Sequence, residues 1–431
     1  MALKHEGWEV TSRPDDYSVA GTDASTRLYA CANVASAVSI VHADRNTPGF
    51  MRAPAETPYL FALESAMDEL AYALNMDPVQ LRLLNDTQVE PINGLPYTSR
   101  HLRECFETAA SAFGWSRRSA APRSMRDGDW LVGWGTAASM YPTQVAPAAV
   151  RVRLTPNGSA RVQSATHEIG NGVRTALAIT ASEALGVPLA RIEVETGDTL
   201  LPPAPVSGGS NSTASVCNAV AKACEEIRDR IARAAVADAA SAFAGAEAAT
   251  LKLHDGQLSG PGNRSESLAH AAGRLQQGAI EVYVENNPAG AEPDASSSLY
   301  AGHAKLAGGA SLKDRVQFAF GAHFVEVRVH ARTGEIRAPR AVGAFAFGRI
   351  VNPIAAKSQL MGGQIWGISA ALHEATDIDR RQARYYNDDL AEYLIPVNAD
   401  IIDVQTFMVP EMDTQVNKLG IKGVGELGNV G

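Results

Sequence analysis

The 431-residue sequence has few cysteines and no closely spaced metal ligands. Its four cysteines, Cys31, Cys105, Cys217 and Cys224, form no C-x-x-C pair, and no H-x-x-x-H spacing occurs. His101 and Cys105 are the only close His-Cys pair, and two side chains do not complete a tetrahedral metal site. We therefore expect this chain to encode neither a zinc site nor an iron-sulfur cluster.

Long hydrophobic runs and basic clusters are also missing. Met1 to Val10 has no apolar core of a signal peptide, and no run of about 18 apolar residues indicates a membrane span. This pattern favours a cytoplasmic protein, or a periplasmic one exported with a partner. The net charge is -9 without a Lys/Arg cluster, which argues against a nucleic-acid surface. Because no G-x-S-x-G is present, a serine hydrolase is disfavoured, and we expect another kind of small-molecule site.

What is present is the composition of an ordinary globular protein, with 45% hydrophobic and 20% charged residues. Apolar spacing predicts a helix from Leu60 to Leu74, which Asp77-Pro78 stops and restarts, and a second helix from Arg100 to Gly114. Alternating patterns predict paired strands in 28–43 and further strands at 130–140, 148–154, 160–165, 192–196, 322–330, 336–347 and 403–409. Helices are expected at 173–185, at 216–240 and from Pro353 to His373.

These elements predict an α+β fold of mixed sheets with packed helices. A Ser/Arg/Pro-rich stretch at 116–129 suggests a boundary, so we expect one domain at 1–125 and a second at 126–431. The second domain would hold two similar subdomains, at about 126–285 and 312–431. Residues 286–311 have no period and are expected to form a surface loop, and 241–275 are expected to be small, exposed and variable.

One stretch near the end, Lys422 to Gly428, carries a lone carboxylate among glycines and small apolar residues. Glycines such as Gly425 allow the backbone to approach another group closely, and apolar surroundings disfavour the charged form of a carboxylate. Glu426 is therefore a candidate base. The alternative is a flexible glycine-rich tail with an exposed Glu, and the two interpretations are about equally supported locally.

Two other stretches have the composition of ligand cradles. At 166–174 a strand ends in a G-x-G turn before a helix, so the backbone N–H groups and Arg174 suit a phosphate. The alternative is an ordinary strand-turn-helix junction. At 207–215 glycines and hydroxyl residues precede the long helix in greater number than capping requires. Arg52 lies in a Pro-bounded turn before the first long helix, where surface and functional roles are equally open.

Four motifs in this order resemble the molybdenum-binding subunit of the molybdenum hydroxylases, the xanthine dehydrogenase and aldehyde oxidase family. They are FMRAPAE at 50–56, HEIGNGVRT at 167–175, SGGSNSTASV at 207–216 and KGVGELGNVG at 422–431. The resemblance covers most of the chain, from about residue 29 to residue 431. It is nearest to the bacterial multi-subunit aldehyde oxidoreductases, and it implies the molybdopterin-binding fold of that family.

The resemblance also implies roles for individual residues. Glu426 matches the catalytic base beside molybdenum, and Arg52 begins a loop whose backbone lies at the metal. The residues that match cofactor contacts are Gly170, Asn171, Gly172, Arg174, Ser212, Thr213, Ala214, Ser215, Gln359 and Gly425. Among them Arg174 suits the phosphate, and the backbone of Ala214 lies nearest the metal.

The implied activity is hydroxylation of an aldehyde or N-heterocycle with oxygen derived from water, on a molybdenum-molybdopterin cofactor that can carry a cytosine dinucleotide. Iron-sulfur centres and FAD would then reside on partner subunits, which agrees with the scarcity of cysteine. The front portion of the family's subunit has no counterpart in this sequence and would be a further partner. The alternatives are a truncated chain without activity and a simple module that binds a phosphate ligand at the Gly170 turn.

Overall fold

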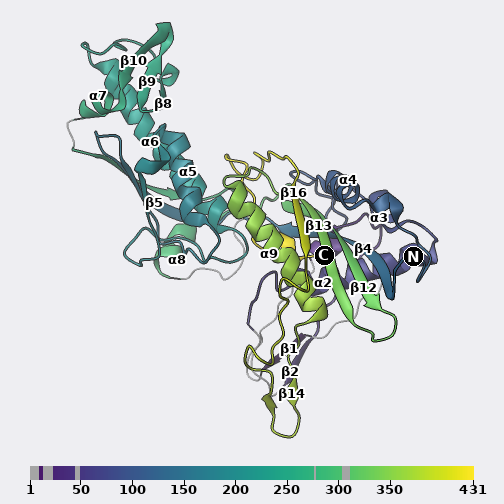
Figure 1. Ribbon diagram of the computed structural model, residues 1–431. Helices are drawn as coiled ribbons and strands as arrows, with labels where there is room; N and C mark the ends of the chain where they lie inside the picture. The colour runs from purple at the N-terminus through teal and green to yellow at the C-terminus, as the bar shows by residue number, and fades with distance from the viewer. Residues whose placement is uncertain (1–8, 13–22, 44–48, 276–277, 303–310) are drawn as a thin grey trace.

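Two lobes, each built on a β-sheet, make up most of the described structure (Figure 1). The computed structural model describes residues 9–12, 23–43, 49–275, 278–302 and 311–431. We call the lobes the five-stranded lobe and the four-stranded lobe after their sheets. Helix α9 (Pro353–Leu372) lies between them, and the C-terminus ends near its middle (Figure 1). The predicted mixture of sheets and packed helices is confirmed.

The five-stranded sheet joins strands that are distant in sequence. Its order is β16-β13-β12-β4-β3, with β3 (Arg126–Asp127), β4 (Trp130–Pro142), β12 (Phe318–His330), β13 (Ile336–Ala346) and β16 (Asp403–Met408). β12 pairs antiparallel with both β4 and β13, and β13 pairs parallel with β16. The predicted Thr333-Gly334 reversal joins β12 to β13, and Gly334 has a positive φ of 74°.

Helices cover this sheet and share its core. They are α1 (Asp23–Arg27), α2 (Glu56–Ala73), α3 (Pro78–Leu84) and α4 (Leu102–Phe113), together with α9. Asp77 caps α3 by accepting from the backbone N–H groups of Val79 and Gln80, as its place before Pro78 predicts. Within the described residues, no helix combines the length and the apolar character that crossing a membrane requires.

The four-stranded lobe has the sheet order β11-β5-β6-β7. Its strands are β5 (Ala148–Leu154), β6 (Ala160–Gln163), β7 (Ile192–Glu195) and β11 (Ile280–Asn286). Helices α5 (Val173–Leu185) and α6 (Ser212–Ala237) pack against each other and bury a separate apolar cluster with these strands. Glycines with positive φ bound α5 at both ends, at Gly172 and Gly186.

Short elements complete the described chain. They are the parallel pair β1 (Glu9–Ser12) and β2 (Ile40–Ala43), the sheet of β8 (Lys252–His254), β9 (Gln257–Gly260) and β10 (Arg264–Ser267), helices α7 (Leu268–Gly273) and α8 (Ala295–Tyr300), and the pair β14 (Ile378–Asp379) and β15 (Arg384–Tyr385). The 3₁₀ turns are η1 (Trp115–Arg117), η2 (Leu189–Arg191), η3 (Ala248–Thr250), η4 (Pro261–Asn263) and η5 (Leu427–Asn429).

Four local predictions are wrong in part. Residues 28–43 do not form paired strands with each other, because β2 pairs with β1 and the preceding residues are irregular. Residues 241–275 form a small sheet and α7 with a buried Phe243 side chain, so they are not merely exposed. The predicted loop at 286–311 contains α8, and its residues 303–310 lie outside the described structure. Helix α6 begins at Ser212, four residues before the predicted start.

The hydrophobic cores do not divide at residue 125. One cluster joins α2 and α4 to β4, β12, β13 and the terminal segment, and the other covers the four-stranded lobe. Strand β4 belongs to the first predicted subdomain of the second domain, yet it pairs with β12 of the other subdomain and contacts α2 of the predicted first domain. The domain boundary at 125/126 and the two similar subdomains therefore stay predictions, and the core groups these elements differently.

Candidate functional site

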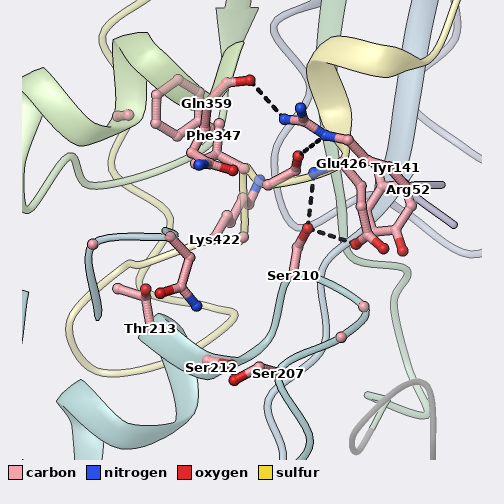
Figure 2. Close-up of a pocket in the computed structure, with 18 of the residues that line it drawn as sticks. Arg52, Tyr141, Ser207, Ser210, Ser212, Thr213, Phe347, Gln359, Lys422 and Glu426 are labelled. Carbon is pink, nitrogen blue, oxygen red and sulfur yellow. Dashed lines mark hydrogen bonds between the residues drawn. The ribbon is translucent and has the colours of Figure 1, made fainter. Parts of the chain in front are cut away.

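A cavity of about 870 Å³ lies at the junction of the two lobes. Its lining draws on the turn before α2, the end of β4, the turn before α5, the start of α6, helix α9 and the terminal segment. Of the predicted residues, those that line it are Arg52, Asn171, Gly172, Ser212, Thr213, Gln359, Gly425 and Glu426. The structure thus brings both predicted cradles and the terminal carboxylate to one cavity (Figure 2).

The terminal carboxylate is held by a serine from the second cradle. Ser210 Oγ donates to Glu426 Oε2 at 2.6 Å, and the backbone N–H of Glu426 donates to the same Oγ at 3.0 Å (Figure 2). The approach depends on Gly423, because a Cβ there would lie 1.8 Å from the carbonyl oxygen of Ser210. Glu426 is half-buried. The alternative of a flexible tail with an exposed Glu does not describe this segment.

Two further titratable side chains line the cavity near Glu426, and the site predictions did not include them. Tyr141, at the end of β4, is buried, which raises its pKa, and the charges of Glu426 and Glu56 and a hydrogen bond to Glu426 raise it further. Glu56 is the first residue of α2 and is also buried. Burial raises the pKa of Glu56 to about 7, with the charges of Glu426 and Asp23 adding to the effect and its own backbone N–H opposing it.

Glu56 and Tyr141 differ in whether a sequence motif marks them as site residues. Glu56 ends the FMRAPAE motif and could have been proposed from it. Tyr141 follows a regular strand pattern, and nothing local distinguishes it from a core residue.

Arg52 connects three parts of the site. Its Nε donates to the carbonyl of Gly425 and its Nη2 donates to the carbonyl of Gln359 at 2.6 Å (Figure 2). Its guanidinium also lies 6.0 Å from the ring centroid of Trp366. Burial lowers the pKa of Arg52, and the charge of Glu426 partly restores it. Arg52 therefore fixes the terminal segment against α9, a function that its local sequence left open.

The first cradle is already occupied by a carboxylate of the same chain. Glu168 Oε1 accepts from the backbone N–H groups of Gly170 at 3.0 Å and Gly172 at 2.9 Å, and its Oε2 accepts from that of Arg174 at 3.1 Å. The turn therefore has the predicted anion-binding geometry. A phosphate at the same N–H groups would have to displace Glu168.

Arg174 and Gln359 differ in their relation to the cavity. Arg174 is exposed, does not line the cavity, and donates from Nη2 to Thr196 Oγ1 at 3.2 Å. Gln359 on α9 lines the cavity and donates from Nε2 to the carbonyl of Gly170 at 3.2 Å. Gln359 thereby links the two lobes directly.

The second cradle, residues 207–215, is a loop as far as Asn211 and continues into the first turn of α6. Ser212 and Thr213 line the cavity, whereas Ala214 and Ser215 are buried away from it. Ser215 Oγ donates to the carbonyl of Asn211 and accepts from the backbone N–H of Ala146, both at 2.8 Å. Ser215 therefore has its hydroxyl satisfied inside the first turn of α6, which begins four residues earlier than predicted. Cofactor contacts by Ala214 and Ser215 stay predictions.

A buried ion cluster fixes the start of the terminal segment. Lys422 Nζ lies 2.7 Å from Glu411 Oε1 and 2.9 Å from Asp413 Oδ2, with both side chains of each pair at most 1% exposed. It also donates to Ser99 Oγ and to the carbonyl of Phe318. These contacts hold the chain four residues before Glu426. Among the residues that the structure describes, no group of three or more His, Cys, Asp or Glu side chains could hold a metal ion.

Family models identify most of the chain. A model described as a molybdopterin cofactor-binding domain matches residues 108–402, and a second with the same description matches residues 3–86. The aldehyde oxidoreductase molybdenum-binding subunit PaoC of Escherichia coli (strain K12) is 37% identical over 433 residues, covering 100% of this chain and 54% of that protein. The putative xanthine dehydrogenase molybdenum-binding subunit XdhA of the same strain is 27% identical, covering 95% and 53%.

Solved structures agree on the fold. Quinoline 2-oxidoreductase from Pseudomonas putida 86 has a TM-score of 0.79 at 19% identity, over 94% of this chain and 51% of that one. CO dehydrogenase from Oligotropha carboxidovorans has a TM-score of 0.75 at 19% identity, over 91% and 49%. The chain spans about half the length of the curated relatives it matches. The resemblance predicted from the four motifs is confirmed: the chain belongs to the family of molybdopterin cofactor-binding domains and is related to the molybdenum-binding subunits of aldehyde oxidoreductases and xanthine dehydrogenases.

Proposed function

We propose that this chain forms the back portion of the active site of a molybdenum-dependent oxidoreductase that hydroxylates aldehydes or N-heterocycles with oxygen derived from water. The observation that carries the proposal is the position of Glu426, which lies in a cavity where the two cradles meet. A polypeptide corresponding to the other half of its relatives, an iron-sulfur subunit and an FAD subunit would be its partners. Relatives named as aldehyde oxidoreductase and xanthine dehydrogenase subunits support this class of reaction.

The cavity suits a pterin cofactor in size and in chemistry. A volume of about 870 Å³ lies within the usual range of cofactor sites, roughly 300–1,000 Å³. The hydroxyls of Ser212 and Thr213 and the amide of Asn171 would bind polar edges of the pterin, with Gln359 beside them. Arg174 at the start of α5 would contact the phosphate or a cytosine dinucleotide extension. When bound, the molybdenum centre supplies the redox chemistry and the oxygen transfer.

The residues of this chain would then hold the base in position and accept the proton. Glu426 would take a proton from the reacting group, and Ser210 would hold its carboxylate toward the cavity. Arg52 would keep the terminal segment in place through the carbonyls of Gly425 and Gln359. The apolar side chains of Phe347, Trp366 and Ile350 line the same cavity and would limit the access of water.

The test is co-expression of this chain with a polypeptide that corresponds to the preceding half of its relatives and with iron-sulfur and FAD subunits. We expect the assembly to retain molybdenum and to oxidise an aldehyde or N-heterocycle. Glu426→Gln should remove turnover by a factor of at least about 100 while the molybdenum content is kept. The matched control is Glu69→Gln, which alters an exposed carboxylate on α2 outside the cavity, and should retain turnover per bound molybdenum.

Two outcomes would reject the proposal. If the complete assembly retains no molybdenum, the chain is a truncated product without activity. If Glu426→Gln turns over at the wild-type rate, Glu426 is not the base. A phosphate-binding module at the Gly170 turn predicts a different result, namely that Arg174→Ala abolishes binding while changes at Ser212 and Thr213 do not.

A further inference from the structure

Glu56 has no part in the proposed reaction so far, yet it lies in the same cavity as the proposed base. It is the first residue of α2, its exposed fraction is 7%, and it lines the cavity together with Tyr141 and Glu426. The three side chains come from α2, from β4 and from the terminal segment. A buried carboxylate that lines a ligand cavity is unusual, because burial disfavours its charge. Among the residues that the structure describes, no ion pair joins Glu56 to a cation.

The groups that act on Glu56 are mostly acidic. The charge of Glu426 acts on it from the terminal segment and that of Asp23 from α1, and Tyr141 in turn feels the charge of Glu56. Arg52 precedes it by four residues, but the guanidinium of Arg52 is engaged by the carbonyls of Gly425 and Gln359. Burial is the largest cause and raises the pKa of Glu56 to about 7. Near neutral pH, Glu56 therefore exchanges protons readily.

A base that accepts a proton in each turnover must also lose it. Glu426 is held by the hydroxyl of Ser210 and lies beside Tyr141, so one of its oxygens already accepts a hydrogen bond. Ser210 and Tyr141 are poor final acceptors, because a neutral hydroxyl has little tendency to take up a second proton. Burial and the neighbouring carboxylates keep Tyr141 in its neutral form by raising its pKa. Of the cavity-lining residues around Glu426, Glu56 is the other carboxylate.

We propose that Glu56 receives the proton from Glu426 and releases it to solvent water between turnovers. This inference rests on the proposed function. In the transfer the O–H bond on Glu426 breaks, an O–H bond forms on Glu56, and no electrons change hands. Glu56 acts through Glu426 and touches neither the substrate nor the reacting atoms. Glu56 is thus an auxiliary proton carrier, and only its unprotonated form can accept the proton from Glu426.

The test uses the complete co-expressed assembly, with turnover divided by bound molybdenum. Wild-type kcat should fall as the pH drops below about 7, because Glu56 must be unprotonated to accept. Glu56→Gln should lower kcat on the order of tenfold or more and remove that inflection. Glu56→Asp should restore part of kcat and an inflection displaced from the wild-type position. Glu69→Gln, an exposed carboxylate on the same helix, is the matched control and should leave both unchanged.

The outcomes separate this inference from the proposed function. Wild-type kcat or an unchanged inflection in Glu56→Gln would overturn the inference, even if Glu426→Gln is inactive as proposed. If Glu56→Gln does not assemble, the inflection of Glu56→Asp decides: a position identical to wild type overturns the inference, and a displaced position supports it. A merely structural Glu56 would change thermal stability and leave the pH profile in place.

Discussion

The buried lysine that anchors the terminal segment gives a prediction that can be worked in detail. Lys422→Met removes one cation and leaves Glu411 and Asp413 facing each other in the core, with side chains 1% and 0% exposed. Removing one partner of a buried ion cluster costs roughly 3–5 kcal/mol, because the remaining charge is uncompensated. Methionine has a similar length and is apolar, so little of this loss should come from a cavity.

A matched control lies four residues earlier in the chain. Lys418 Nζ is also 2.7 Å from a carboxylate, that of Glu225, but its side chain is 72% exposed and that of Glu225 is 40% exposed. An exposed pair contributes about 0–1 kcal/mol, so Lys418→Met should be nearly neutral. The assay is urea unfolding at 25 °C, with the free energy of unfolding compared between the two variants and the wild type.

The pH dependence gives a second readout of the same perturbation. Burial alone would raise the pKa of Asp413, but Lys422 and a hydrogen bond from Ser99 lower it overall. A carboxyl with a lowered folded pKa stabilises the protein above its unfolded pKa of about 3.9, and this is lost as the pH falls through the folded value. The destabilisation by Lys422→Met should therefore be largest near pH 7 and shrink toward pH 3. If Lys422→Met and Lys418→Met unfold at equal urea concentrations, the burial of Lys422 does not increase the contribution of its ion pairs to the free energy of unfolding.

Two further predictions concern the packing of the core. In α9, Gly363→Ala should destabilise the fold by about 1–3 kcal/mol, because its Cβ would lie 2.5 Å from the backbone of Gly428. Gly367→Ala in the same helix meets its nearest atom at 3.8 Å and should stabilise by up to about 1 kcal/mol, and urea unfolding of both variants compares the two. Burial lowers the pKa of His323 to about 4, so its neutral form is favoured in the fold and stability should fall as the pH drops from about 6.5 to about 4. His323→Gln should flatten that part of the stability curve, and an unchanged curve would show that His323 does not titrate as expected.

Elements whose ends carry local signals could be predicted from the sequence. The Asp77 cap before Pro78, the left-handed Gly186 after α5 and Pro353 at the start of α9 all fix an element through the chemistry of one or two residues. The alternation of β12 and β13 and the turn between them were predictable for the same reason. The register between β12 and β4 could not be predicted, because that pairing joins residues about 190 positions apart in the sequence.

The site was predictable in part. The motifs indicated which loops carry hydrogen-bond donors, but not which groups accept hydrogen bonds from those donors. The N–H groups of the Gly170 turn bind the carboxylate of Glu168, two residues earlier, and no pattern distinguishes such an internal partner from a phosphate. The lone acid at 426 was expected among apolar neighbours. The structure adds Ser210 and Tyr141 beside it, because Gly423 admits the 207–210 loop and β4 ends at the same place.

The two lobes are joined around the cavity largely by polar contacts. Gln359 bonds to the carbonyl of Gly170, Asn218 Nδ2 donates to Asn417 Oδ1 at 3.0 Å, and Ser210 holds Glu426. Each apolar cluster draws almost all its members from its own lobe, although Val416 and Ile421 of the terminal region pack into the core of the four-stranded lobe. Polar contacts contribute about 1 kcal/mol each, so the spacing of the two cradles is held less firmly than either core. A ligand that bridges the cradles would therefore stabilise the relative position of the lobes more than it stabilises either lobe alone.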